Sequence, residues 1–147
     1  MNVLTRAIGR QIARFLNRPS STYAPPTTNS LAALRAVIRP GDVLLVEGDR
    51  HISTAIKYLT QSTWSHAALC VATSTDSEPD ALVLIEADMV HGVQLAPLAK
   101  YGSMHTRICR PVGLTPQQIQ TVVDAAVRRC GHPVSYTHLT LPTKRIV

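Results

Sequence analysis

A series of short apolar runs, separated by turn-forming residues, constrains the fold of this chain more than any other feature. Each run has the length of a β-strand and is bounded by Gly, Pro or polar residues. Because strands that follow one another through short connections favour antiparallel pairing, the series predicts an antiparallel sheet. The predicted strands cover residues 41–48, residues 66–73, residues 81–90, a run that begins at Gly92, and residues 105–112.

Two short helices are predicted around the first strand. Residues 31–38 suit a helix that is stopped by Pro40, because proline disfavours helical backbone in the residue before it. Residues 52–60 place their large aliphatic side chains on one helical face, which predicts a helix inserted between the first two strands.

A longer helix is predicted over residues 115–130, where the start signals are clear. Thr115 is the expected N-cap, Pro116 takes the first helical position, and Gln118 completes a capping box. Gly131 marks the expected end of the helix. Consecutive strands with helices before and after them predict an α+β fold, with an antiparallel sheet and flanking helices.

Residues 1–18 have the period of an amphipathic helix, and residues 19–30 are rich in Pro, Ser and Thr, as in an extended linker. The helix could pack on the domain or bind an anionic membrane surface. Charges interrupt any signal-peptide core, and no run is long enough to span a bilayer. We therefore expect a location in the cytoplasm or on the periphery of the inner membrane. Four arginines fall largely on the polar face: Arg6, Arg10, Arg14 and Arg18.

Charge and cysteine content exclude some classes of function. The formal net charge is +6, but no basic cluster is interleaved with aromatic residues, which argues against nucleic-acid binding. The three cysteines are an odd number at wide spacing, which fits neither a disulfide framework nor a standard zinc motif. We expect no metal and no cofactor. The cysteines are Cys70, Cys109 and Cys130.

The stretch VSYTHLTLPT, residues 134–143, differs from the rest of the chain because it has neither amphipathic period nor cap. Its back-translation resembles the end of a transposon-type sequencing adaptor joined to its primer site. We therefore expect residues 134–147 to be a non-native tail and the fold to be incomplete at the C-terminus. The expected division is residues 1–30 as helix and linker, residues 31–133 as a partial domain, and the tail.

His66 and Glu86 are the candidate catalytic residues. His66 opens the second predicted strand, and Glu86 lies inside the apolar run LVLIEAD of the third. A buried carboxylate is costly without a partner, so a contact between Glu86 and the His66 imidazole is expected. An imidazole held in this way can take the proton of a thiol and activate it as a nucleophile.

Other interpretations of these residues stay open at this point. His66 could be an ordinary packed histidine, and Glu86 could lie on a solvated face. Asp88 or His91 could take the place of Glu86, and Cys130 could be the nucleophile. A further alternative is a zinc site formed by His66, Cys70, Cys130 and His132, although its spacings fit no standard motif.

Several motifs in a fixed order carry a resemblance to a known family. They are IRPGDVLLVEG, WSHAAL, LIEADMVHGV and a closing helix followed by GHP, within residues 35–133. Together they resemble the permuted papain-like amidases of the YaeF/YiiX type, relatives of the NlpC cell-wall peptidases and of the lecithin:retinol acyltransferases. This resemblance implies a circularly permuted papain-like fold, with His66 as the family histidine and Glu86 as the polar third member.

The resemblance also implies that the nucleophilic cysteine follows the last helix, yet no cysteine occurs after Cys130. The intact parent is therefore expected to be a cysteine amidase or peptidase that acts through an acyl-enzyme, and the present chain is expected to be inactive. The implied substrates are peptides, cell-wall amides or lipid acyl groups. A lipid acyltransferase or esterase of the same fold is one alternative, and a noncatalytic module on a membrane surface through residues 1–18 is another.

Overall fold

The computed structural model describes residues 11, 18, 30–72, 82–88 and 91–134. Four predicted segments lie entirely or almost entirely outside the described residues. They are the N-terminal helix, the linker, the turn after the second strand and the C-terminal tail. Within the described residues, no helix is long and apolar enough to cross a membrane.

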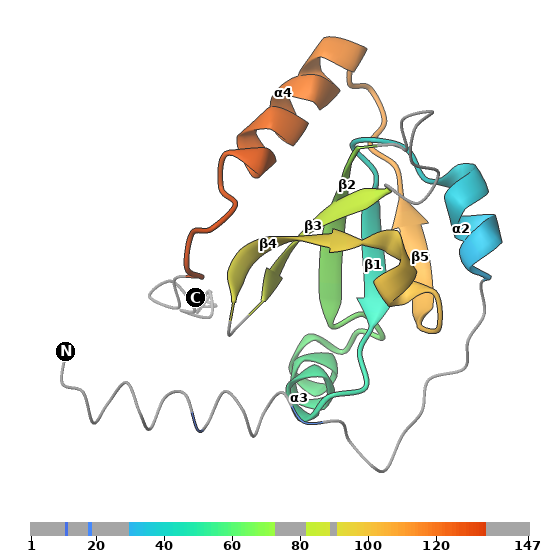
Figure 1. Ribbon diagram of the computed structural model, residues 1–147. Helices are drawn as coiled ribbons and strands as arrows, with labels where there is room; N and C mark the ends of the chain where they lie inside the picture. The colour runs from blue at the N-terminus through green and yellow to red at the C-terminus, as the bar shows by residue number, and fades with distance from the viewer. Residues whose placement is uncertain (1–10, 12–17, 19–29, 73–81, 89–90, 135–147) are drawn as a thin grey trace, which may run out of the picture.

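Five antiparallel strands form a single sheet, as predicted, in the order β4-β3-β2-β1-β5. Strands β1 to β4 each pair with the next strand along the chain, and β5 pairs with the free edge of β1 (Figure 1). With the helices described next, this is the predicted α+β fold. The strands are β1 (Val43–Glu47), β2 (His66–Ala72), β3 (Val83–Asp88), β4 (Gly92–Pro97) and β5 (His105–Cys109).

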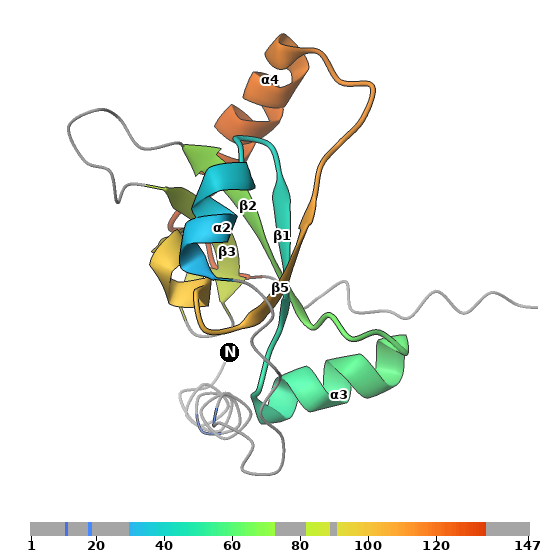
Figure 2. The same cartoon turned by 90° about the vertical axis from the view of Figure 1, so that its right-hand side faces the viewer.

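In the part of the chain that the structure describes, three α-helices and one 3-10 helix lie around the sheet, and each helix predicted there is present. Helix α3 lies beyond one end of the strands, and α4 lies towards the opposite end (Figures 1 and 2). The fourth predicted strand turns into the 3-10 helix η1 directly after β4. The helices are α2 (Leu31–Val37), α3 (His51–Thr60), η1 (Leu98–Tyr101) and α4 (Pro116–Val127).

The core lies on one face of the sheet, which α2 and η1 cover. Side chains on this face alternate with those on the other along each strand, as the pleat requires. Fully burying an aliphatic side chain stabilises the fold by about 1.5–3 kcal/mol, so this face carries most of the apolar stabilisation. The buried residues include Leu44, Val46, Ala68, Cys70, Leu84 and Ala96 of the strands, with Leu34, Ile38, Leu98 and Tyr101 packed against them.

An ion pair between the buried Asp42 and the exposed Arg110 holds the start of β1 to the end of β5. Asp42, which is 1% exposed, accepts hydrogen bonds from Arg110 Nε and Nη2 at 2.8 and 2.7 Å. The Arg39 amide also donates to Asp42, at 2.8 Å. Burial alone would raise the pKa of Asp42, but the hydrogen bonds and charge of Arg110 and Arg39 lower it below the usual value.

Helix α4 begins as the sequence predicts but ends three residues earlier. Thr115 and Gln118 form the capping box in both directions, with donor–acceptor distances of 2.8 and 3.3 Å. The helix ends at Val127 because the amides of Arg129 and Cys130 bond to carbonyls three residues back, which tightens the last turn. Gly131, at φ +81°, then turns the chain onto the edge strand β4, and its amide donates to Val93 at 2.8 Å.

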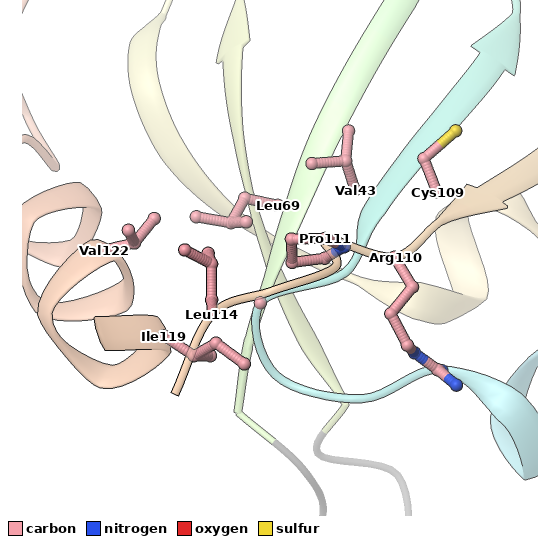
Figure 3. A pocket seen from close by; sticks show the side chains of 9 residues that line it. Val43, Leu69, Cys109, Arg110, Pro111, Leu114, Ile119 and Val122 are labelled. Atoms are coloured by element: carbon pink, nitrogen blue, oxygen red, sulfur yellow. The ribbon is translucent and has the colours of Figure 1, made fainter. Parts of the chain in front are cut away.

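Among the described residues, α4 covers only part of the second face of the sheet (Figure 1). Val123 is the buried residue of α4, whereas Leu95 of β4 remains 56% exposed on this face. Between α4 and the strands lies an apolar cavity of about 340 Å³ (Figure 3). In this cavity Leu114, Ile119 and Val122 face Val43 and Leu69.

Candidate active site

His66 and Glu86 lie on neighbouring strands, on the core face of the sheet. The register pairs His66 of β2 with Val46, and it pairs Glu86 of β3 with Ala68. The histidine and the glutamate are therefore diagonal neighbours, which places long side chains within reach of each other. Both point to the side that buries Val46 and Ala68.

The two side chains are in direct contact, with His66 Nε2 2.9 Å from Glu86 Oε2. A carboxylate can only accept hydrogen bonds, so the proton is assigned to Nε2, and the neutral ring keeps Nδ1 as its acceptor. Glu86 is 2% exposed, whereas the His66 side chain is 31% exposed. One edge of the imidazole is thus held by the protein while the rest of the ring stays accessible.

Three further donors hold the Glu86 carboxylate. Tyr101 OH donates to Oε2 at 2.6 Å, Gln94 Nε2 donates to Oε1 at 2.8 Å, and the Lys100 ammonium also binds Oε1. None of these three donors is predicted from the sequence. The register that places Gln94 opposite Glu86 is a local signal, whereas Lys100 and Tyr101 reach the carboxylate only because η1 folds back over the sheet.

These contacts fix the charge state of the site. Burial would raise the pKa of Glu86, but hydrogen bonds from His66, Lys100, Tyr101 and Gln94 together lower it far below its ordinary value of 4.5. Burial, followed by the hydrogen bond to Glu86 and its negative charge, raises the pKa of Tyr101 above its ordinary value of 10.0. Glu86 is therefore an ionised acceptor, and Tyr101 is a phenol that keeps its proton.

A cavity of about 250 Å³ adjoins His66 and is called here the His66 cavity. It lies between α3, η1 and the ends of β1 and β3 that are nearest to α3. The Tyr101 ring lies beside the imidazole, with a centroid separation of 6.4 Å and an interplanar angle of 24°. A ligand in this cavity would therefore lie against the accessible part of His66. The residues that define the cavity are Val46, Gly48, Asp49, Arg50, Ile52, Ser53, Ile56, Ser65, His66, Glu86, Ala87, Asp88, Lys100, Tyr101 and Met104.

The alternatives to Glu86 have other partners. Asp88 Oδ1 lies 3.0 Å from His91 Nδ1 and accepts the His91 amide at 2.9 Å, so these two residues bond to each other. Both lie towards solvent, since the side chains are 23% and 66% exposed. The structure thus brings His66 to Glu86 and pairs Asp88 with His91.

The zinc alternative finds no geometric basis. In the part of the chain that the structure describes, no group of three or more His, Cys, Asp or Glu residues could hold a metal ion. The four residues weighed for that site, His66, Cys70, Cys130 and His132, are all described residues and do not form such a group.

A second buried carboxylate, Glu47, lies on the opposite face of the sheet and was not singled out by the sequence. Its Oε2 lies 2.8 Å from His105 Nδ1, and its Oε1 accepts from Lys57 Nζ of α3 at 3.1 Å. The His105 ring packs against Trp64, with centroids 5.0 Å apart. Glu47 therefore ties α3 to the ends of β1 and β5.

Comparison with known families adds one finding. The model of a family described as permuted papain-like amidase enzyme, YaeF/YiiX, C92 family, matches residues 37–141. No curated protein matches the chain. The matched range contains the whole described sheet, His66 and Glu86, and it extends into the segment predicted to be a non-native tail.

Proposed function

Because the chain belongs to the permuted papain-like amidase family, we propose that His66 is the general base and Glu86 its orienting partner in a cysteine amidase or peptidase. The observation that carries the proposal is the 2.9 Å contact between His66 Nε2 and the buried, ionised Glu86. This contact leaves Nδ1 as the acceptor for a thiol proton. The family supports peptides or other amides as substrates.

The proposed reaction has two halves, acylation and deacylation, and in each half His66 first accepts a proton and then donates it. The thiol proton passes to Nδ1, and the thiolate attacks the amide carbonyl. His66 then gives that proton to the leaving amine as the C–N bond breaks, which leaves an acyl-enzyme thioester. A water molecule loses a proton to His66 and attacks the thioester. As the C–S bond breaks, His66 returns that proton to the thiolate, which regenerates the thiol and releases the carboxylic acid.

Glu86 has two physical roles in this scheme. It holds the imidazole in the tautomer that leaves Nδ1 unprotonated, and its negative charge stabilises the imidazolium formed after proton transfer. Gln94, Lys100 and Tyr101 position Glu86 rather than touch the substrate amide. Their donors keep the carboxylate ionised although it is buried.

We also propose that none of the three cysteines is the nucleophile. Cys70 is fully buried and lies four residues along β2 from His66, about 13 Å at the rise of an extended strand. Cys109 pairs with Val43 on the second face. Cys130 precedes the residue that bonds to the outer strand β4, and two strand spacings of about 4.8 Å separate β4 from β2.

The 147-residue chain is accordingly expected to show no thiol-dependent hydrolysis. The measurement is labelling with a cysteine-directed acyl probe, followed by identification of any modified cysteine. Labelling that depends on His66, and that His66→Ala abolishes, would contradict this expectation and reassign the nucleophile.

The tautomer of His66 provides the direct test of the proposed pair. Two-dimensional ¹H–¹⁵N spectra of the imidazoles should show His66 protonated at Nε2 and unprotonated at Nδ1 in its neutral form. Glu86→Gln should alter this pattern, whereas the matched control Glu47→Gln should perturb His105 instead. A His66 ring protonated at Nδ1, or one indifferent to Glu86→Gln, would refute the assigned role.

Two finer alternatives have their own discriminating experiments. An acyltransferase or esterase of the same fold would pass the acyl group to an alcohol or take it from an ester. Product analysis with water and with an alcohol as acceptor therefore separates it from an amidase.

Residues 1–18 are the basis for a membrane-surface module, and flotation of residues 1–30 with anionic vesicles tests that module. Absence of binding would remove the membrane alternative.

A further inference from the structure

The lining of the His66 cavity is partly apolar and partly polar. The apolar part, called here the apolar wall, is formed by Ile52 and Ile56 of α3, Val46 of β1 and Met104. His66 and Glu86 belong to the polar part. A group that enters the cavity therefore meets both aliphatic surface and the candidate catalytic pair.

The charged residues of the cavity do not favour an ionic ligand. Three carboxylates, Asp49, Glu86 and Asp88, line the cavity together with two cations, Arg50 and Lys100. The Lys100 ammonium binds Glu86, and Asp88 binds His91. The apolar wall is therefore the part of the cavity with a clear chemical preference.

The volume limits what can bind. A cavity of about 150 Å³ lined by aliphatic and aromatic side chains is large enough for benzene. At about 250 Å³, the His66 cavity has room for one leucine- or phenylalanine-sized side chain. A long acyl chain would extend beyond it.

We propose that the His66 cavity binds a compact apolar side chain next to the scissile amide of the substrate, with Ile52, Ile56 and Met104 as specificity-determining residues. This inference rests on the proposed function, since His66 and Glu86 define where the amide lies. It narrows the substrate class to peptides or acyl-amides with a leucine-like residue at the reacting bond.

The test compares two ligands of similar shape, N-acetyl-leucinamide and N-acetyl-asparaginamide, which share branching at the γ-carbon. Binding to the full 147-residue chain is followed through the Met104 methyl and His66 ring resonances. The leucine compound should bind about 10-fold or more tightly, because an apolar wall discriminates by desolvation. Equal affinities, or no binding of either compound, would overturn the inference.

A matched pair of variants on α3 locates the binding site. Ile56→Trp should fill the cavity and reduce leucinamide affinity about 10-fold or more, whereas Leu59→Trp, at a position 72% exposed, should leave it unchanged. Equal effects of both variants would overturn the inference. If Ile56→Trp does not fold, Ile56→Ala enlarges the cavity and should shift the preference towards N-acetyl-phenylalaninamide; an unchanged preference counts against the proposal.

Failure of this inference can be told apart from failure of the proposed function. Loss of the leucine preference with an intact, Glu86-dependent tautomer of His66 would overturn only the side-chain specificity. Tight leucinamide binding with a His66 tautomer that does not depend on Glu86 would overturn the catalytic pair and leave the cavity as an apolar binding site.

Discussion

Two buried glutamates bind histidines at the same end of the sheet, one on each face. Glu86 holds His66 on the core face, and Glu47 holds His105 on the other. Both carboxylates are nearly inaccessible, at 2% and 5% exposure. By burial and histidine contact alone, either pair could be taken for a catalytic pair.

The surroundings of the two imidazoles differ. His66 binds its glutamate through Nε2 and borders a cavity, whereas His105 binds through Nδ1 and packs its ring against Trp64. Glu47 also binds Lys57, so its contacts join α3 to the sheet. A buried carboxylate–histidine contact therefore becomes a candidate site only where a ligand can reach the other ring nitrogen.

The largest expected difference between the two pairs is in stability. Glu86→Gln should reduce the free energy of unfolding by about 3 kcal/mol, because it removes a buried charge to which four side chains donate. Glu47→Gln should cost less, about 1–2 kcal/mol, because the Glu47 side chain is 5% exposed, against 1% for Glu86. Urea unfolding at neutral pH measures both, and equal losses would remove this distinction.

The pH dependence of stability should follow Glu86. Its folded pKa lies below the unfolded value of 4.5, so its contribution is complete above that pH and is lost as pH falls through the folded pKa. Asp42, whose pKa is also lowered, adds to the loss in acid. The free energy of unfolding, measured from neutral pH down to about pH 3, should therefore fall less with decreasing pH for Glu86→Gln than for the wild type. Parallel curves would show that Glu86 is not held ionised.

Tyr101→Phe tests the phenol that supports the carboxylate. Tyr101 is 1% exposed and donates to Glu86 at 2.6 Å, so loss of its hydroxyl should cost about 2 kcal/mol in the free energy of unfolding. Tyr58→Phe is the matched control, because Tyr58 is 76% exposed and the change should stay within about 0.5 kcal/mol. Thermal or urea unfolding checks both variants, and similar effects at the two positions would argue against the network.

The sequence predicted the order of elements because each depends on local pattern. The apolar runs give the strands, and the Thr115–Gln118 capping box fixes the start of α4. The predicted end of α4 is wrong because it relies on Gly131 as the helix-ending residue. The positive φ of Gly131 follows a tightened turn and not the last residue of the helix. Glu86 could be found because a carboxylate inside an apolar run needs a partner.

The rest of the site depends on contacts that the local pattern does not encode. Glu47 stands at the end of its strand beside Gly48, where a glutamate is as common on a solvated surface as in a buried pair. Its partner His105 lies 58 residues further along the chain. Lys100 and Tyr101 became part of the site only because η1 packs over β3, which depends on the tertiary fold.

The smallest expected effect separates the two histidines. His105→Gln removes the contact with Trp64 and weakens the anchor of α3, at a cost of about 1 kcal/mol in the free energy of unfolding. Because His105 lies on the face opposite His66, this change should leave the Nε2-protonated tautomer of His66 intact in ¹⁵N spectra. If His105→Gln instead shifted that tautomer, the two glutamate–histidine pairs would be coupled through the end of the sheet. Glu47 and His105 would then belong to the groups that position His66.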